Sequence, residues 1–233
     1  MGKVCAIVGV GPGNGRAFAQ RFVAGGYQVA LCARRQEIVE AEAKALGEAA
    51  AGYVVDATDD RSMEDCFRAI EREQGPIDTL IYNAGNAKWG TIDDIAPAEL
   101  LPGFDVNVAG LVRATQSVLP GMRARGTGNI IVVGAGAALR GRPATLGFAA
   151  AKAAQRSAAQ SLARQLGPEG IHVALLILDG VIDIETTMAR MSDKPKEFFL
   201  AAAGIADAAF TLTEQDKQAW TFELDLRPYV ENW

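Results

Sequence analysis

Residues 147–152 read Gly-Phe-Ala-Ala-Ala-Lys, so the aromatic ring of Phe148 stands four residues before the ammonium group of Lys152. If the stretch is helical, both side chains lie on one face, because residues four apart are neighbours on a helix. A lysine can bind hydroxyl groups as a point charge, but a phenyl ring has no proton to donate. The chemistry available here therefore depends on the groups that other elements bring to this pair.

A glycine-rich turn lies near the start of the chain, where Gly9, Gly13 and Gly15 follow the spacing GxxxGxG. The spacing GxGxxG fits no register, because its last glycine would fall on Asn14 or Arg16. Glycines let the backbone turn sharply, and the helix that follows offers amide donors and the positive end of its dipole to a diphosphate. We therefore expect a dinucleotide phosphate to bind this turn, which contains Gly9, Gly11, Pro12, Gly13, Asn14 and Gly15.

The end of the second predicted strand carries positive charge, because Arg34 and Arg35 directly follow Ala33. In a dinucleotide-binding fold the adenine ribose lies at this point, where a carboxylate would bind the 2′-hydroxyl and an arginine favours a 2′-phosphate. The position therefore favours NADP(H) over NAD(H) as the cofactor. The alternative interpretation is a pair of solvated arginines that begin a helix.

The elements that must position these groups alternate along the chain. Short runs rich in Val, Ile and Leu predict strands near 3–9, 27–33, 52–55, 77–82, 129–134, 171–178 and 221–226. Longer segments of helical period predict helices at 14–25, 36–48, 61–74, 97–119, 144–166 and 204–212. This alternation is typical of βαβ units, so we expect an α/β fold with a doubly wound parallel sheet of about seven strands and helices on both faces. No Pro/Ser-rich linker or repeat marks a second domain.

The composition excludes several classes of function. A net charge of -5 argues against nucleic acid as a partner, since phosphates require a basic face. Three scattered cysteines and a single histidine, His172, predict no metal site and reduced thiols in a cytosol. No apolar run approaches the ~18 residues of a membrane span, and the N-terminal apolar run ends in a Gly/Pro/Asn turn, as a buried strand would and a secretory signal would not. We expect a cytoplasmic protein that acts on a small molecule and contacts no membrane.

Further motifs resemble those of the short-chain dehydrogenase/reductase family, in the same order, from Lys3 to about residue 188. Asp56 follows the third predicted strand and matches the family's acidic residue at adenine. Residues 82–85, Tyr-Asn-Ala-Gly, resemble the family's Asn-Asn-Ala-Gly, and Asn107 matches the asparagine of its catalytic tetrad. The glycine turn is similar to the family's cofactor loop.

The resemblance implies a single Rossmann domain over residues 1–233 and an oxidoreductase that uses a nicotinamide cofactor. It assigns catalytic positions to Asn107 and Lys152. Besides the glycine turn and the two arginines, the implied cofactor contacts are Asp56, Ala57, Asn83, Ala84, Gly85, Lys152, Gly180 and Ile182.

The chain departs from the family's pattern at the positions of the catalytic side chains. Phe148 stands at the position of the family's tyrosine and Ala135 at that of its serine, while Asp179 replaces the proline of a Pro-Gly pair. A general acid is typically worth 10² to 10⁴-fold in rate, and Phe148 cannot supply one. Thr145, Arg140 and Arg142 lie nearby, but none has the spacing of a replacement donor.

Three functions fit these residues. The first is an NADP(H)-dependent oxidoreductase with a degenerate active site and a small, partly apolar substrate. Its proton would come from substrate, water or other residues, or its substrate would need none, as in reduction of an activated C=C or C=N bond. The second is a non-catalytic NADP(H)-binding protein, a sensor or partner subunit, and the third is a lyase or isomerase that reuses the pocket. Two residues have simpler alternatives, a solvated Lys152 and an Asn107 that satisfies a local helix kink.

Two further segments are expected to make contacts. Residues 181–199 predict a lid over the substrate, because loops at the carboxyl ends of strands build such sites. The alanine-rich helix at 144–166 and the tail with Tyr229 and Trp233 predict a homodimer or homotetramer, although burial within the chain would explain the small residues equally.

Overall fold

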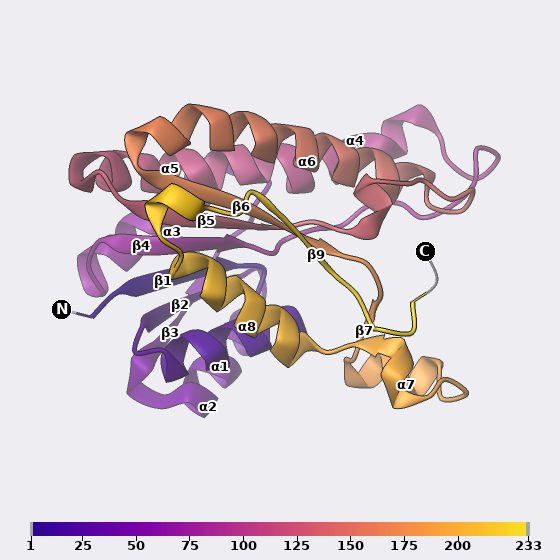
Figure 1. Ribbon diagram of the computed structural model, residues 1–233, viewed down its shortest axis with the longest axis horizontal. Coiled ribbons are helices and arrows are strands. Elements are labelled where there is room, and N and C mark those ends of the chain that lie inside the picture. Colours follow the sequence, from indigo (N-terminus) through magenta and orange to yellow (C-terminus); the bar gives the residue numbers. More distant parts are fainter. Residues whose placement is uncertain (1, 232–233) are drawn as a thin grey trace.

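The computed structural model describes residues 2–231 and contains a seven-stranded parallel sheet (Figure 1). Its strands are β1 (Val4–Val8), β2 (Gln28–Ala33), β3 (Ala50–Val54), β4 (Ile77–Tyr82), β5 (Gly128–Val133), β6 (Ile171–Leu178) and β9 (Glu223–Leu226). They lie in the order β3-β2-β1-β4-β5-β6-β9, and every neighbouring pair is parallel. The predicted α/β fold with a doubly wound sheet is confirmed.

Helices cover both faces of this sheet (Figure 1). One face packs against α1 (Asn14–Ala24), α2 (Gln36–Leu46) and α8 (Ala202–Thr213), and the other against α3 (Asp60–Glu73), α5 (Gly110–Arg125) and α6 (Leu146–Leu166). Because both faces are covered, the central strands are mostly apolar, and every residue of β6 is buried. No helix within residues 2–231 is both long and apolar enough to cross a membrane.

Short elements connect these layers. A π-helical turn, η3, spans Asp105–Ala109, and the short α-helices are α4 (Leu101–Phe104) and α7 (Glu185–Arg190). β7 (Val181–Ile182) pairs with β8 (Phe199–Leu200) in a separate ribbon. The single 3₁₀ turns are η1 (Gly47–Ala49), η2 (Pro97–Leu100), η4 (Gly136–Ala138), η5 (Gly167–Glu169), η6 (Lys196–Phe198) and η7 (Lys217–Ala219). The sequence did not predict α7, β7 or β8, because elements of two to six residues carry too little periodicity.

The helix predicted at 97–119 is interrupted and extends further than expected. It consists of η2, α4, η3 and α5 in succession. The Tyr82 hydroxyl donates to the Val106 carbonyl at 2.5 Å, so a carbonyl of the π-helical turn accepts a hydrogen bond from strand β4. α5 continues past Pro120 to Arg125, because Met122 is fully buried and Arg125 donates to the Ile77 carbonyl at 2.6 Å. Tertiary packing thus offsets the hydrogen bond that proline cannot make.

The order of the strands reverses at β1, which lies between β2 and β4. The connection that follows β2 crosses one face of the sheet, and the connection that follows β4 crosses the other. A crevice therefore forms at the carboxyl ends of β1 and β4. The glycine turn after β1 and residues 83–85 after β4 therefore meet at this edge of the sheet.

The glycine turn offers a test of local packing. A Cβ added at Gly15 would lie 2.7 Å from Val10 Cα and 2.9 Å from the Gly9 carbonyl oxygen, whereas a Cβ at Gly11 meets no atom within 4 Å. Gly15→Ala is expected to lower the free energy of unfolding by about 1–3 kcal/mol because backbone must move. Gly11→Ala is the matched control and is expected to stay within about 1 kcal/mol of wild type. Urea denaturation of both variants measures the difference, and equal stabilities would contradict this packing.

Candidate active site

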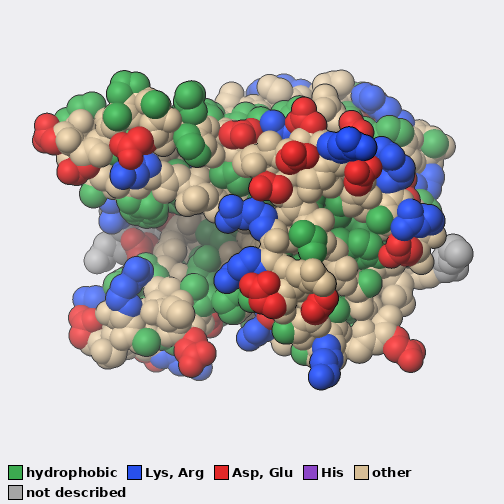
Figure 2. Space-filling model, turned by 180° about the vertical axis from the view of Figure 1, so that it is seen from behind, with side chains coloured by type: hydrophobic (Ala, Val, Ile, Leu, Met, Phe, Trp, Pro, Cys, Tyr) green, Lys and Arg blue, Asp and Glu red, His purple; other side chains and the backbone are tan. Residues whose placement is uncertain are grey.

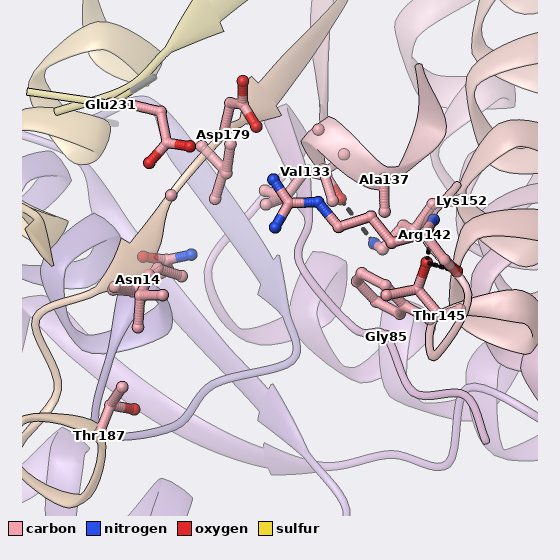
Figure 3. Close-up of a pocket in the computed structure, with 18 of the residues that line it drawn as sticks. Asn14, Gly85, Val133, Ala137, Arg142, Thr145, Lys152, Asp179, Thr187 and Glu231 are labelled. Atoms are coloured by element: carbon pink, nitrogen blue, oxygen red, sulfur yellow. Dashed lines mark hydrogen bonds between the residues drawn. The ribbon is translucent and has the colours of Figure 1, made fainter. Parts of the chain in front are cut away.

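A cavity of about 660 Å³ opens at the carboxyl ends of the central strands. Figure 2 shows a hollow between two projecting parts of the molecule, with hydrophobic side chains on its walls. Figure 3 shows residues from distant parts of the chain around it, among them Asn14 from α1, Gly85 from the loop after β4 and Lys152 from α6. The sheet edge thus gathers segments that the sequence separates by more than a hundred residues.

Lys152 lies at the inner wall of the cavity and is only 6% exposed. Its Nζ donates to the Val133 carbonyl and to Gln155 Oε1, both at 2.9 Å. Gln155 is fully buried, and its Nε2 donates to the Asn107 carbonyl at 3.0 Å. Burial lowers the pKa of Lys152 to about 8, since a charged amine is costly where water is excluded. Lys152 is therefore an ordered side chain and is not solvated on the helix face.

Asn107 sits in the π-helical turn η3 and is fully buried. Its Nδ2 donates to the Asn86 carbonyl at 2.6 Å and to the Gly103 carbonyl at 2.8 Å, while its Oδ1 has no partner among the described residues. The bond to Gly103 is the local helix contact that the sequence left open, and the bond to Asn86 ties the turn to the loop after β4. A Cβ on Gly85 would lie 3.0 Å from Asn107 Oδ1 and 3.2 Å from Lys152 Nζ, so these three residues meet.

The glycine turn and the loop after β4 approach each other closely. Gly9 has a φ of +100°, and a Cβ there would lie 2.4 Å from the Ala84 nitrogen. Asn83 Nδ2 donates to the Gly9 carbonyl at 2.7 Å and fixes this approach. Asn14, at the start of α1, faces the cavity with a buried Oδ1 that has no partner among residues 2–231 (Figure 3). A helix start without a side-chain cap, a glycine cradle and an unpaired amide oxygen fit a dinucleotide.

Comparison with known proteins agrees with this geometry. The family model described as short chain dehydrogenase matches residues 3–196. The chain belongs to the short-chain dehydrogenase family. It is 32% identical to an oxidoreductase of Sarocladium schorii over 75% of this chain and 70% of the relative. It is 35% identical to the sorbitol dehydrogenase of Cereibacter sphaeroides over 79% of this chain and 72% of the relative.

Solved structures of the same fold cover nearly the whole chain. A 3-ketoacyl-(acyl-carrier-protein) reductase from Brucella melitensis complexed with NADH is 27% identical, with a TM-score of 0.88 over 97% of both chains. A serine dehydrogenase complexed with NADP+ is 23% identical, with a TM-score of 0.88 over 99% of this chain and 96% of the other.

In this member of the short-chain dehydrogenase family, Phe148 is half-buried one turn before Lys152 and lines the cavity. Its ring stacks on Trp89, with centroids 4.8 Å apart and planes 18° apart. Ala135 also lines the cavity, from the loop after β5. Neither Phe148 nor Ala135 carries a hydroxyl, so the inner wall is apolar beside the Lys152 amine.

Asp179 directly follows β6 and joins two parts of the cavity wall. Its N–H donates to the Leu226 carbonyl at 2.8 Å, a bond that proline could not make. Its carboxylate accepts from Arg140 Nη2 at 2.6 Å. Gly180 and Ile182 follow it and line the cavity as well. Asp179 therefore holds the strand β9 on one side and the loop after β5 on the other.

The residues predicted at the adenine end lie outside this cavity, at the ends of β2 and β3. Arg34 and Arg35 are exposed, and neither guanidinium is paired within the described chain. Asp56 accepts from the Thr58 N–H at 2.9 Å and hydroxyl at 2.7 Å, and these bonds, with a smaller effect of Arg34, hold its carboxyl pKa below the usual value. Ala57 follows it, buried.

Sequence reasoning missed Gln155, Trp89 and the ion pair between Arg140 and Asp179. Gln155 had a local signal, because it follows Lys152 by three residues and so shares its helix face. Trp89 had none, since its loop meets α6 only in the folded chain. The Arg140–Asp179 pair joins residues 39 positions apart and carries no signal in the sequence.

Gln155→Leu tests the network at Lys152. The change removes one acceptor of the ammonium and the donor to Asn107, so it should destabilise the protein by at least about 2 kcal/mol. It should also move the pKa of Lys152 further below 8, because the charged form loses a hydrogen bond. Lysine-labelled NMR and urea denaturation measure both effects. Gln165→Leu, on the exposed side of the same helix, is the control. An unchanged titration of Lys152 in Gln155→Leu would show that Gln155 does not hold it.

Proposed function

We propose that the protein is an NADP(H)-dependent oxidoreductase with a degenerate active site. One observation carries the proposal: Lys152, Asn107 and Gly85 meet at one wall of a cavity that Asn14 of the glycine turn faces. The resemblance assigns Asn14, Gly85 and Lys152 to the cofactor and Asn107 to the catalytic tetrad. This juxtaposition supports a cofactor site, and the lack of a hydroxyl on Phe148 and Ala135 supports a degenerate reacting half.

The amides at the start of α1 and the glycine turn would hold the diphosphate of the cofactor, with Asn14 beside it. Lys152 would bind the ribose next to the nicotinamide, since its third N–H is left over after the bonds to Val133 and Gln155. Arg34 makes no hydrogen bond or ion pair within residues 2–231, so its guanidinium can bind a 2′-phosphate, which favours NADP(H). When bound, the cofactor supplies or accepts a hydride.

Phe148 and Ala135 occupy the positions of the family's tyrosine and serine in this proposal. Without these hydroxyls a simple ketone would receive no proton at the reacting oxygen, at a loss of roughly 10² to 10⁴-fold in rate. An activated C=C or C=N bond suits the site better, because water or the substrate itself can provide its proton. Residues 181–199 would form the lid. Ile184 of this segment already lies over the glycine turn, because a Cβ on Gly13 would meet its Cγ2 at 2.5 Å.

The absence of both hydroxyls also favours a second candidate, a non-catalytic NADP(H)-binding protein. A lyase or isomerase that reuses the pocket is the third. A stoichiometric change of the nicotinamide absorbance with an enone or imine panel would support the oxidoreductase. Tight NADPH binding without turnover on that panel would favour the binding protein.

We also propose a homodimer or homotetramer. Large apolar side chains are exposed on neighbouring helices, with Leu101 67%, Val112 38% and Leu146 37% exposed. Tyr229 is 85% exposed, and the expected contact of Trp233 lies outside the described residues. Burial of such side chains against a second copy would remove them from water.

Cofactor preference can be tested at Arg34. Arg34→Glu should weaken NADPH binding by roughly tenfold or more, because a charged hydrogen bond is replaced by repulsion of the 2′-phosphate. Affinity for NADH should change far less. Calorimetric titration of both nucleotides measures this, with Arg164→Glu, an exposed arginine near the end of α6, as the control for net charge. Equal affinities of the wild type for NADPH and NADH would refute the assignment.

The missing proton donor can be tested by restoration. The double change Phe148→Tyr, Ala135→Ser should raise reduction of simple ketones at least about tenfold, because it supplies an acid and a second donor to the substrate oxygen. Steady-state kinetics of wild type, both single variants and the double variant measure the gain. A wild type that is already fast on ketones would show that another donor exists. A double variant that binds NADPH normally but gains nothing would favour the second or third candidate.

A further inference from the structure

The cavity is positively charged within a protein whose net charge is -5. Near neutral pH four of its charged lining residues are cations and two are anions: Arg140, Arg142, Lys152 and Arg190 against Asp179 and Glu231. A concave site with an excess of one sign concentrates ligands of the other sign. The cavity therefore attracts anions, although the molecule as a whole repels them.

These cations are not equally available. Arg140 is paired with Asp179 at 2.6 Å, and Lys152 is buried against neutral oxygens. The guanidinium of Arg142 has neither a hydrogen bond nor an ion pair within residues 2–231. Figure 3 shows it extended from the loop before α6 into the middle of the cavity. Arg142 thus presents an unpaired charge to whatever enters.

The backbone that carries Arg142 is held in place. The Thr145 hydroxyl accepts from the Arg142 N–H at 2.8 Å and donates to its carbonyl at 3.0 Å. The Gly90 N–H donates to the Ala144 carbonyl at 3.0 Å, so this loop is joined to the loop that carries Trp89. The Thr145 hydroxyl is therefore used by the loop itself, and these bonds fix the backbone from which Arg142 enters the cavity.

That wall is flat and apolar. Phe148 and Trp89 stack nearly parallel, and Val133, Leu178 and Phe198 add apolar surface to the same cavity. A planar, apolar group would bury against these side chains. The fork of one guanidinium matches the two oxygens of a carboxylate.

We propose that the cavity binds a substrate with an aryl or similarly apolar body and a carboxylate, and that Arg142 anchors the carboxylate. Turnover of this ligand as a substrate rests on the proposed oxidoreductase function, whereas its binding as an anion rests only on the cavity. Arg190, which lies on α7 across from this loop, is the competing anchor that the test must separate.

The probe is 3-phenylpropanoate, compared with its neutral amide of nearly the same shape, 3-phenylpropanamide. Both are titrated by calorimetry into the protein saturated with NADP+. The wild type should bind the acid at least about tenfold more tightly than the amide, the ratio expected from one charge-assisted hydrogen-bonded pair. Arg142→Gln should remove this preference, and Arg142→Lys should keep part of it. Arg164→Gln, which makes the same charge change on exposed α6, should leave the preference intact.

Several outcomes would overturn the anchor. They are equal affinity for acid and amide in the wild type, no detectable binding of the acid at millimolar concentration, or a preference that survives Arg142→Gln and disappears in Arg190→Gln. Circular dichroism confirms that each variant is folded before titration. If the wild type binds no NADP+, the proposed function fails, and the same titration without nucleotide still decides whether Arg142 selects an anion.

Discussion

The burial of one ammonium group, that of Lys152, is the constraint on which the cavity depends. A charged amine removed from water is costly unless its protons find acceptors. Two neutral oxygens accept them here, from Val133 at the end of β5 and from Gln155 on α6. Gln155 in turn donates to the Asn107 carbonyl in the π-helical turn. These hydrogen bonds therefore join a strand end, a long helix and an irregular turn at the inner wall of the cavity.

The opposite wall depends on the close approach of two backbones. The Gly9 position leaves no room for a side chain against Ala84, and the Asn83 amide closes the contact with a hydrogen bond to the Gly9 carbonyl. These residues follow β1 and β4, the two strands at which the order of the strands reverses. The edge of the sheet thus exposes backbone amides and the unpaired Asn14 amide oxygen toward the cavity. This geometry leaves the start of α1 open toward the cavity.

The arginines of the cavity differ in whether a carboxylate pairs with them. The Asp179 carboxylate pairs with Arg140 and its backbone N–H donates to the Leu226 carbonyl of strand β9, so one residue serves both the charge balance and the sheet. Arg142 has no hydrogen bond or ion pair within residues 2–231 and lines the same cavity as the stacked rings of Phe148 and Trp89. The cavity therefore combines a positive charge with an apolar surface.

The sequence by itself determined the fold class, because apolar runs of strand length alternate with segments of helical period and the observed strands lie within about two residues of the predicted ones. It also placed Phe148 and Lys152 on one helix face and the glycine turn before a helix, since both depend on local spacing. Only the tertiary structure decided that Gln155 holds Lys152 to Asn107, and that a helix predicted at 97–119 contains a π-helical turn. Those contacts join side chains from distant segments, and their energies depend on burial and distance, which local sequence patterns do not encode.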